Sequence, residues 1–264
     1  MFPYRDENET QRTAIVTGTI IGLNVLTWIV VQGAGDTIPL ASSVCELGLI
    51  PGELTGSLPV GTGFSMGDRL VCATDPGPQV AHLLTSMFMH GSWMHLLGNM
   101  WFLWIFGDNV EDSMGHLRFA VFYLLCGLAA AIGQVVTDPG SPIPMVGASG
   151  AISGVMGGYL LLYPNVRVFA ILPLGFFITS IALPAWAMLG YWFLIQFVSG
   201  LAAFGSEIGG SVDHELEWMW LTKGFSFDCP GVNPGETAYM MFQSRDVEHQ
   251  TILFQISRVR RLAG

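Results

Sequence analysis

Charged side chains are scarce in this chain. Lys, Arg, Asp and Glu make up 11% of its 264 residues, whereas an average soluble domain carries about 25%. Hydrophobic residues make up 51%, and the mean hydropathy is +0.52. A soluble protein with so few charges would have too little polar surface to cover its core. The composition therefore predicts an all-α fold in lipid, a polytopic membrane helix bundle.

Positive charge is scarcer still, with 10 Lys and Arg against 20 Asp and Glu and a net charge of −10. A nucleic-acid interface needs clustered Lys and Arg, so the chain is not expected to bind nucleic acid. A cleavable signal peptide is also lacking. The first twelve residues are polar, and the apolar run after them has no small-residue cleavage site, which favours an uncleaved helix.

Cysteine is too rare, at four residues, for a disulfide scaffold. Cys45 and Cys72 nevertheless fall in the same loop. A bridge between them is one interpretation, and it requires that the loop face an oxidising compartment. Two separate free thiols are the other, and the sequence does not choose between them.

Long apolar runs are what the chain has in abundance. A membrane helix needs about 20 mainly apolar residues, and five runs approach that length. A sixth apolar stretch, 168–183, is short and broken by Pro173 and Gly175, which predicts a re-entrant or interfacial hairpin. The five predicted spans are Ala14–Val31, Val80–Phe106, Leu117–Val136, Ala148–Tyr163 and Ala185–Phe204.

The few cations are placed asymmetrically. Four arginines lie beside ends of the spans that share one side if the spans alternate, whereas the loop 32–79 has one Arg and five Asp or Glu. The positive-inside rule then places residues 1–13 in the cytoplasm and the long loop outside, in the membrane of a prokaryotic cell. The four arginines are Arg5, Arg12, Arg118 and Arg167.

Polar residues interrupt the second span. His95 and Asn99 are four residues apart and share one helical face, whereas His90 and His95 are about 140° apart around a regular helix. Strongly polar groups in a membrane helix are costly and commonly mark function. The alternative is that they hydrogen-bond neighbouring helices. Ser92 precedes this helical segment and is a suitable cap for a helix that starts at Trp93.

The fourth span opens with small residues. Gly150, Gly154 and Gly158 repeat every four residues and predict a face that another helix approaches closely. Ser149 and Ser153 lie beside this face. A serine at the mouth of a helix is well placed to be a nucleophile, with its own backbone N–H directed at a developing oxyanion. Ordinary small-residue packing is the alternative.

Several of these segments together resemble the rhomboid family of intramembrane serine proteases, over roughly residues 14–210. The segments are Met89–Asn99 (MHGSWMHLLGN), Gly107–Phe119 (GDNVEDSMGHLRF), Gly147–Gly150 (GASG), Leu47–Glu53 (LGLIPGE) and Ile171–Phe177 (ILPLGFF).

The resemblance implies a role for each matching residue. Ser149 would be the nucleophile, and His95 and Asn99 would donate hydrogen bonds to the oxyanion. Glu111 would have a structural role. No metal or cofactor is implied, and the HExxH signature of zinc proteases is absent. The implied partners are the lipid bilayer and transmembrane protein substrates.

The resemblance fails where the general base is expected. In the family this histidine lies on a sixth helix, close to a Gly-Gly pair. Here Gly209 and Gly210 are followed by His214 between Asp213 and Glu215, and each charge at the centre of a membrane helix opposes insertion by about 2.5–3.5 kcal/mol. His214 is either the base in an altered setting or an exposed, inert histidine, and a role of another kind also stays open.

Composition changes abruptly at the same point, because residues 205–264 hold 13 of the 30 charged residues. The predicted organisation is a cytoplasmic segment 1–13, a membrane domain 14–210 and an atypical polar tail 211–264. A frameshifted or truncated sixth helix is our hypothesis for the change.

Three functions compete at this stage. The first is an active serine endopeptidase that cuts transmembrane substrates, and the second is an inactive relative that binds membrane segments. The third is a small transporter that uses the second-span histidines as a proton relay. The absence of an inverted repeat and the presence of the GASG motif argue against the transporter.

The topology is testable by cysteine-accessibility labelling of intact cells. Single cysteines introduced at 107–116 should be protected from an impermeant reagent, and those introduced in 32–79 should react. Labelling of 107–116 from outside would overturn the topology.

Overall fold

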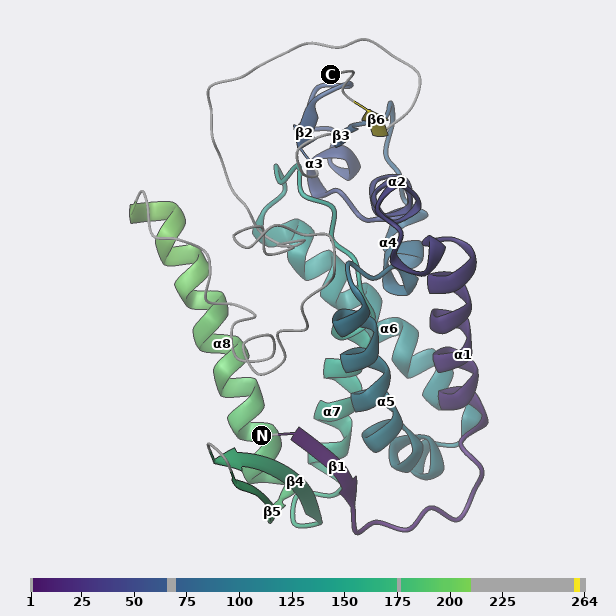
Figure 1. Cartoon of the computed structure of the whole chain (residues 1–264), viewed down its shortest axis with the longest axis vertical. Coiled ribbons are helices and arrows are strands. Elements are labelled where there is room, and N and C mark those ends of the chain that lie inside the picture. Colours follow the sequence, from purple (N-terminus) through teal and green to yellow (C-terminus); the bar gives the residue numbers. More distant parts are fainter. Residues whose placement is uncertain (1, 66–69, 175–176, 210–258, 262–264) are drawn as a thin grey trace. The chain divides into compact units, whose positions relative to one another are not determined.

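The computed structural model describes residues 2–65, 70–174, 177–209 and 259–261 (Figure 1). Within these residues the chain divides into a unit that extends to Ala185 and a second unit that begins at Trp186. The first unit contains the bundle and both sheets, and the second contains most of helix α8. Helices predominate, and the longest are α1 (Ile15–Val30), α5 (Trp93–Met114), α6 (His116–Thr137), α7 (Ser149–Leu162) and α8 (Ala185–Gly209).

The helix boundaries follow the sequence prediction closely for four of the five runs. The second run is divided, as its polar residues suggested. The short turns α4 (His82–Thr85) and η2 (Ser86–Phe88) come first, and α5 begins at Trp93. Ser92 caps α5, because its Oγ accepts a hydrogen bond of 3.1 Å from the backbone N–H of His95.

One helix among the described residues is both long and apolar enough to cross a membrane, judged by length and composition. This is α6, with a mean hydropathy of 2.1 over its best window. Helices α1 and α7 and the apolar part of α8 are shorter. Helix α5 has 22 residues but carries Asp108, Glu111 and Asp112 near its end. The five spans therefore stay a prediction.

Helices α6 and α7 pack closely through glycine. A Cβ atom built on Gly154 would lie 2.5 Å from Cys126 Cβ of α6, and one built on Gly150 would overlap Ala130 Cβ. Gly158 faces Phe122 at an ordinary contact distance. The glycine repeat therefore does form a close helix contact, at its first two positions.

Strands correct the expectation of an all-α fold. Strand β1 (Phe2–Asp6) pairs with β4 (Arg167–Leu174), which pairs in turn with β5 (Phe177–Pro184). The hairpin predicted at 168–183 is present, but its arms are extended. Its sequence is rich in Val, Ile and Phe, which favour strands, and pairing satisfies backbone groups that short helices would leave exposed.

The loop 32–79 is also structured. It contains η1 (Gly33–Gly35), α2 (Thr37–Leu47), α3 (Pro51–Leu54), β2 (Gly63–Ser65) and β3 (Leu70–Ala73), and β3 pairs with β6 (Val259–Arg261). Cys45 and Cys72 are joined by a disulfide, so the bridged alternative is correct. Within the first unit, this loop and the β1-β4-β5 sheet lie at opposite ends of the bundle (Figure 1).

Glu111, at the sheet end of the bundle, caps α1 from another helix. Its two carboxylate oxygens accept hydrogen bonds from the backbone N–H groups of Val16 (2.8 Å) and Thr17 (2.7 Å), and the Thr17 hydroxyl and His116 also bond to it. Ala14, at the N-cap position, provides no side-chain cap. A carboxylate at a helix N-terminus satisfies orphan donors and complements the helix dipole, which agrees with a structural role.

Asp6 ties β1 to two helices. Its Oδ2 accepts a hydrogen bond of 2.9 Å from Asn109 Nδ2 of α5 and another from the Tyr159 hydroxyl of α7. Trp101 adds a hydrogen bond of 2.6 Å from Nε1 to the Pro3 carbonyl. Burial raises the pKa of the Asp6 carboxyl above its ordinary value of 3.8, although the bond from Tyr159 partly opposes this.

Replacing Gly154 tests the helix contact. Gly154→Leu should destabilise the protein by about 1–3 kcal/mol, because overpacking forces α6 and α7 apart. Gly157→Leu is the matched control, since a Cβ atom there meets nothing within 4 Å. Thermal melting in detergent measures both, and equal melting temperatures for the two variants would contradict the contact.

Asp6 predicts a pH dependence of stability. The folded state raises the pKa of Asp6, so this group's contribution is fully present below pH 3.8 and is lost as pH rises through the higher folded value. Asp6→Asn keeps an acceptor for Asn109 and Tyr159 without the buried charge. The melting temperature of the variant should therefore rise relative to the parent between pH 4 and pH 7, and a constant difference would exclude this cause.

Candidate active site

Ser149 is the first residue of α7, and it is exposed. The residue before it, Ala148, provides no side-chain cap, so the first backbone N–H groups of α7 are not satisfied by a capping side chain. Ser153 lies one turn later, and its Oγ donates a hydrogen bond of 2.7 Å to the Ser149 carbonyl. Ser153 is thus engaged within α7, whereas the hydroxyl of Ser149 is at the open end of the helix.

Gly147 brings this helix end against α5. Its φ of +122° is one that residues with a Cβ rarely adopt. A Cβ atom there would lie 2.6 Å from His95 Cε1, 2.7 Å from His95 Nε2 and 3.6 Å from Asn99 Nδ2. The backbone two residues before Ser149 therefore packs closely against the His95 ring and lies near the side chain of Asn99.

His95 is oriented by its own helix entrance. The backbone N–H of Gly91 points at His95 Nδ1 across 3.4 Å. Because Nδ1 accepts this bond, the neutral ring carries its proton on Nε2, the atom that faces Gly147. Asn99 lies one turn along the same face, is buried, and has no hydrogen-bond partner for Nδ2 among the described residues. Two side-chain donors thus converge beside the turn that leads to Ser149.

His90 packs against the His95 ring. Its ring is fully buried and lies edge-on to the His95 ring, with centroids 5.0 Å apart. The Gln32 side chain holds the His90 backbone in both directions, because its Nε2 donates to the carbonyl (2.7 Å) and its Oε1 accepts from the N–H (2.8 Å). Gln32 is not among the residues predicted from the sequence, although a glutamine directly after the first apolar run was a detectable signal.

Three of the predicted site residues, His95, Asn99 and Ser149, therefore lie around the turn at Gly147 in the first unit. The fourth, His214, is not placed. His214 lies outside the described residues, as does most of the tail 211–264. No group of three or more His, Cys, Asp or Glu side chains in the described ranges is arranged to hold a metal ion. A serine at a helix mouth, with a histidine and an amide nearby, has the kind of donors that oxyanion stabilisation requires.

Comparison with known proteins identifies the family. The Rhomboid domain profile matches residues 77–213, slightly more than half of the chain. The chain belongs to the rhomboid family, whose members are integral membrane proteins.

Individual relatives are similar over shorter regions. The chain is 34% identical to Rhomboid protease GluP of Bacillus subtilis over 128 residues, which is 48% of this chain and 24% of the relative. It is 32% identical to RHOMBOID-like protein 6, mitochondrial, of Arabidopsis thaliana over 168 residues (59% and 54%). It is also 38% identical to Putative rhomboid protease YdcA of Bacillus subtilis over 80 residues (30% and 40%). The chain thus spans less than two thirds of these relatives' length, and no solved structure matches it.

Gly147 is the position where the site geometry can be tested without an activity assay. Gly147→Ala should destabilise the protein by about 1–3 kcal/mol, because it forces a strained φ and places a methyl group against the His95 ring. Gly140→Ala, in the same loop but with nothing described within 4 Å of its Cβ position, is the control. Equal thermal stability of the two variants would show that Gly147 does not contact His95.

Proposed function

We propose that the helix mouth at Ser149 is the catalytic centre of an intramembrane serine endopeptidase. One observation carries the proposal: the Gly147 backbone lies against His95 and Asn99, which places two side-chain donors beside the serine that opens α7. His95, Asn99 and Ser149 lie in the segments that resemble motifs of the rhomboid family, and the chain belongs to that family.

The proposed reaction is acyl transfer. Ser149 Oγ attacks the carbonyl carbon of the scissile peptide and passes its proton to a base, and the carbonyl oxygen becomes an oxyanion. His95 Nε2–H, the Asn99 amide and the Ser149 backbone N–H stabilise this charge, and loss of one such donor typically costs about 10²–10³ in rate. The proton then passes to the leaving amine, and water hydrolyses the acyl-enzyme to regenerate the serine.

His214 is the proposed base, in an altered setting. A serine hydroxyl is a weak nucleophile without a base within hydrogen-bond reach. His214 provides one only if the segment around it packs beside Ser149, and that would bury Asp213 and Glu215 or hold them in a water-filled cavity. The free-energy cost of burying these two charges is large, so we expect the serine to be poorly activated. The oxyanion donors do not depend on this segment.

The substrates are proposed to be transmembrane proteins, cut near their outer ends. Ser149 opens α7 at the end of the bundle where the disulfide-bonded loop lies, and the topology prediction places that end outside. The site needs no cofactor for this chemistry. The cell membrane of a prokaryote is the proposed location, and relatives carry both bacterial and mitochondrial names.

A second candidate is a rhomboid-type protein that binds transmembrane segments without cutting them. It is favoured by the charged sequence that follows Gly210, where the small-residue helix around the family's histidine is not matched. Labelling with a fluorophosphonate probe in membranes separates the two candidates, because only an activated serine reacts.

Cleavage of a generic transmembrane reporter by the purified protein tests the proposed function. The parent chain should cleave very poorly, because a serine hydroxyl without a base within hydrogen-bond reach is a weak nucleophile. Ser149→Ala should abolish the residual cleavage, and His95→Ala should reduce it by about 10²–10³.

His214→Ala assigns the base. Robust cleavage by the parent that requires Ser149 and disappears in His214→Ala would show that the chain is active and that His214 is the general base. Cleavage that survives His214→Ala would place the base elsewhere. Cleavage that survives Ser149→Ala would remove the proposed nucleophile.

A further inference from the structure

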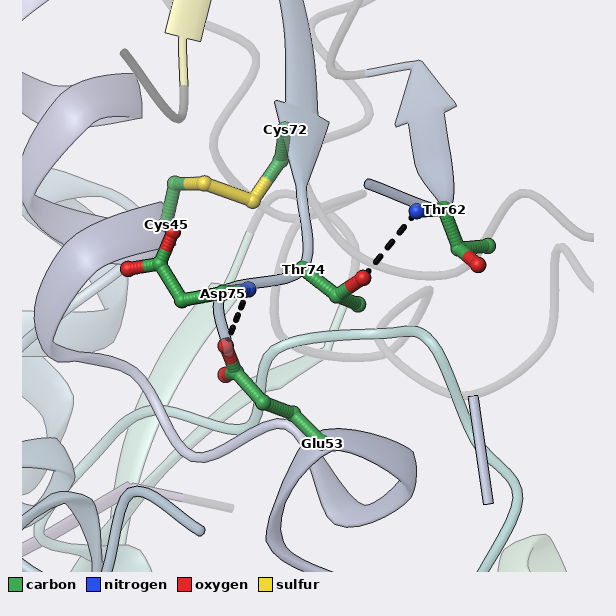
Figure 2. The surroundings of a disulfide bond; sticks show 6 residues. All are labelled: Cys45, Glu53, Thr62, Cys72, Thr74 and Asp75. Carbon is green, nitrogen blue, oxygen red and sulfur yellow. Dashed lines mark hydrogen bonds between the residues drawn. A yellow bond between two sulfur atoms is a disulfide. The ribbon is translucent and has the colours of Figure 1, made fainter. Parts of the chain in front are cut away.

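The disulfide lies at the centre of the structured outer loop. It joins Cys45 of α2 to Cys72 of β3, which are 27 residues apart in the chain (Figure 2). Both cysteines are fully buried and pack with Ile50, and Leu58 and Phe64 cover this cluster. The bridge therefore fixes the end of α2 and the turn that follows it against β3.

Hydrogen bonds extend this attachment to α3. The Glu53 carboxylate of α3 accepts a bond of 2.5 Å from the backbone N–H of Asp75, just after β3 (Figure 2). Thr74 Oγ1 accepts a bond of 3.0 Å from the Thr62 N–H and donates one of 2.8 Å to the Pro59 carbonyl. The segment that follows α2 is thus fastened to β3 at both ends.

The same segment, residues 48–57, forms hydrogen bonds with the loop that leads to Ser149. Leu49 and Met145 form an antiparallel bridge, with N–H to carbonyl distances of 3.0 and 2.7 Å. The Gly52 N–H donates to the Ser141 carbonyl at 2.9 Å. The hydroxyls of Thr55 and Ser57 both donate to the Pro139 carbonyl, at 2.7 and 2.9 Å. Hydrogen bonds therefore attach the loop at three residues to the segment 48–57. The residues of the segment that form them are Leu49, Gly52, Thr55 and Ser57.

The loop 139–147 leads directly to the proposed site at Ser149. After Met145 the chain passes to Gly147, whose N–H donates to the Ser86 carbonyl at 2.9 Å and whose backbone abuts the His95 ring. Pro142 and Pro144 lack the backbone N–H that local hydrogen bonding would need. The position of this loop is therefore set largely by its outer partner.

We propose that the Cys45–Cys72 disulfide is a positioning brace for the proposed active site. The disulfide immobilises the segment 48–57, and this segment holds the loop 139–147 in place. The loop in turn keeps Gly147 against His95 and the start of α7, at Ser149, near Asn99. Cys45 and Cys72 act through other residues and touch no reacting atom. The catalytic part of this inference rests on the proposed function, whereas the coupling between bridge and loop does not.

Hydrogen–deuterium exchange on the full-length protein in detergent tests the coupling. In the double variant Cys45→Ser/Cys72→Ser, the amides of Gly52, Met145 and Gly147 should exchange about tenfold faster or more, because the locally opened segment gains conformational freedom that the disulfide restricts. The amides of Val16 and Thr17, held by Glu111 at the opposite end of the bundle, should be unchanged. Gly133→Ala in α6, where a Cβ atom would meet nothing within 4 Å, is the control and should leave all five amides unchanged.

A second variant keeps the test independent of the disulfide. Thr55→Val/Ser57→Ala removes both hydroxyl bonds to Pro139 and leaves the bridge intact, and it should also accelerate exchange at Met145 and Gly147. The ¹³Cε1 resonance of His95 provides a further readout, because Gly147 lies against that atom, and it should shift in both double variants.

Two results would overturn the proposal. Faster exchange near β3 with no change at Met145, Gly147 and the His95 resonance would show that the bridge stabilises only its own loop. Faster exchange that includes Val16 and Thr17 would show a general loss of stability. Failure of the proposed function looks different, since reporter cleavage would then be independent of Ser149 while the exchange pattern still decides the brace.

Discussion

The close approach of α6 and α7 is the contact on which the rest of the bundle depends. In lipid the hydrophobic effect gives little drive to helix association, so helices associate by close packing of small residues. At Gly154 the two helices are so near that a single methyl group would meet Cys126. This contact fixes the path of α7, and the path of α7 places its first residue, Ser149, beside α5.

The two ends of the bundle are closed in different ways. At the end with β1, individual side chains satisfy the exposed polar groups, as Glu111 does for α1 and as Asp6 does for Asn109 and Tyr159. At the other end, a folded loop with its own disulfide holds the loop before α7 through backbone hydrogen bonds. The proposed site lies at this second end, next to Gly147, whose φ of +122° is one that residues with a Cβ rarely adopt.

The site separates two requirements of serine catalysis. Stabilisation of an oxyanion depends on donors fixed by the bundle, and His95 and Asn99 are the donors we propose. Activation of the nucleophile depends on a base from the segment after Gly210, where the sequence departs from the family pattern. Membership of the rhomboid family therefore accounts for the first requirement more fully than for the second. The proposed site is therefore expected to support only weak cleavage.

The sequence alone predicted the long helices and the main residues of the proposed site, because a long apolar run in lipid is commonly helical and a strongly polar residue within it is costly. The runs gave helix limits within a residue or two for α1, α6 and α7. The polar residues of the second run indicated His95 and Asn99, and the small-residue mouth of the fourth run indicated Ser149. Only the tertiary structure decided what depends on distant pairing. The strands of 167–184 form because β1 is available beside them, the disulfide forms because α2 and β3 meet, and Gln32 and Asp6 acquire partners 58 and 103 residues away. No local pattern encodes these contacts, since each is selected by the need to satisfy polar groups where the ends of the helices come together.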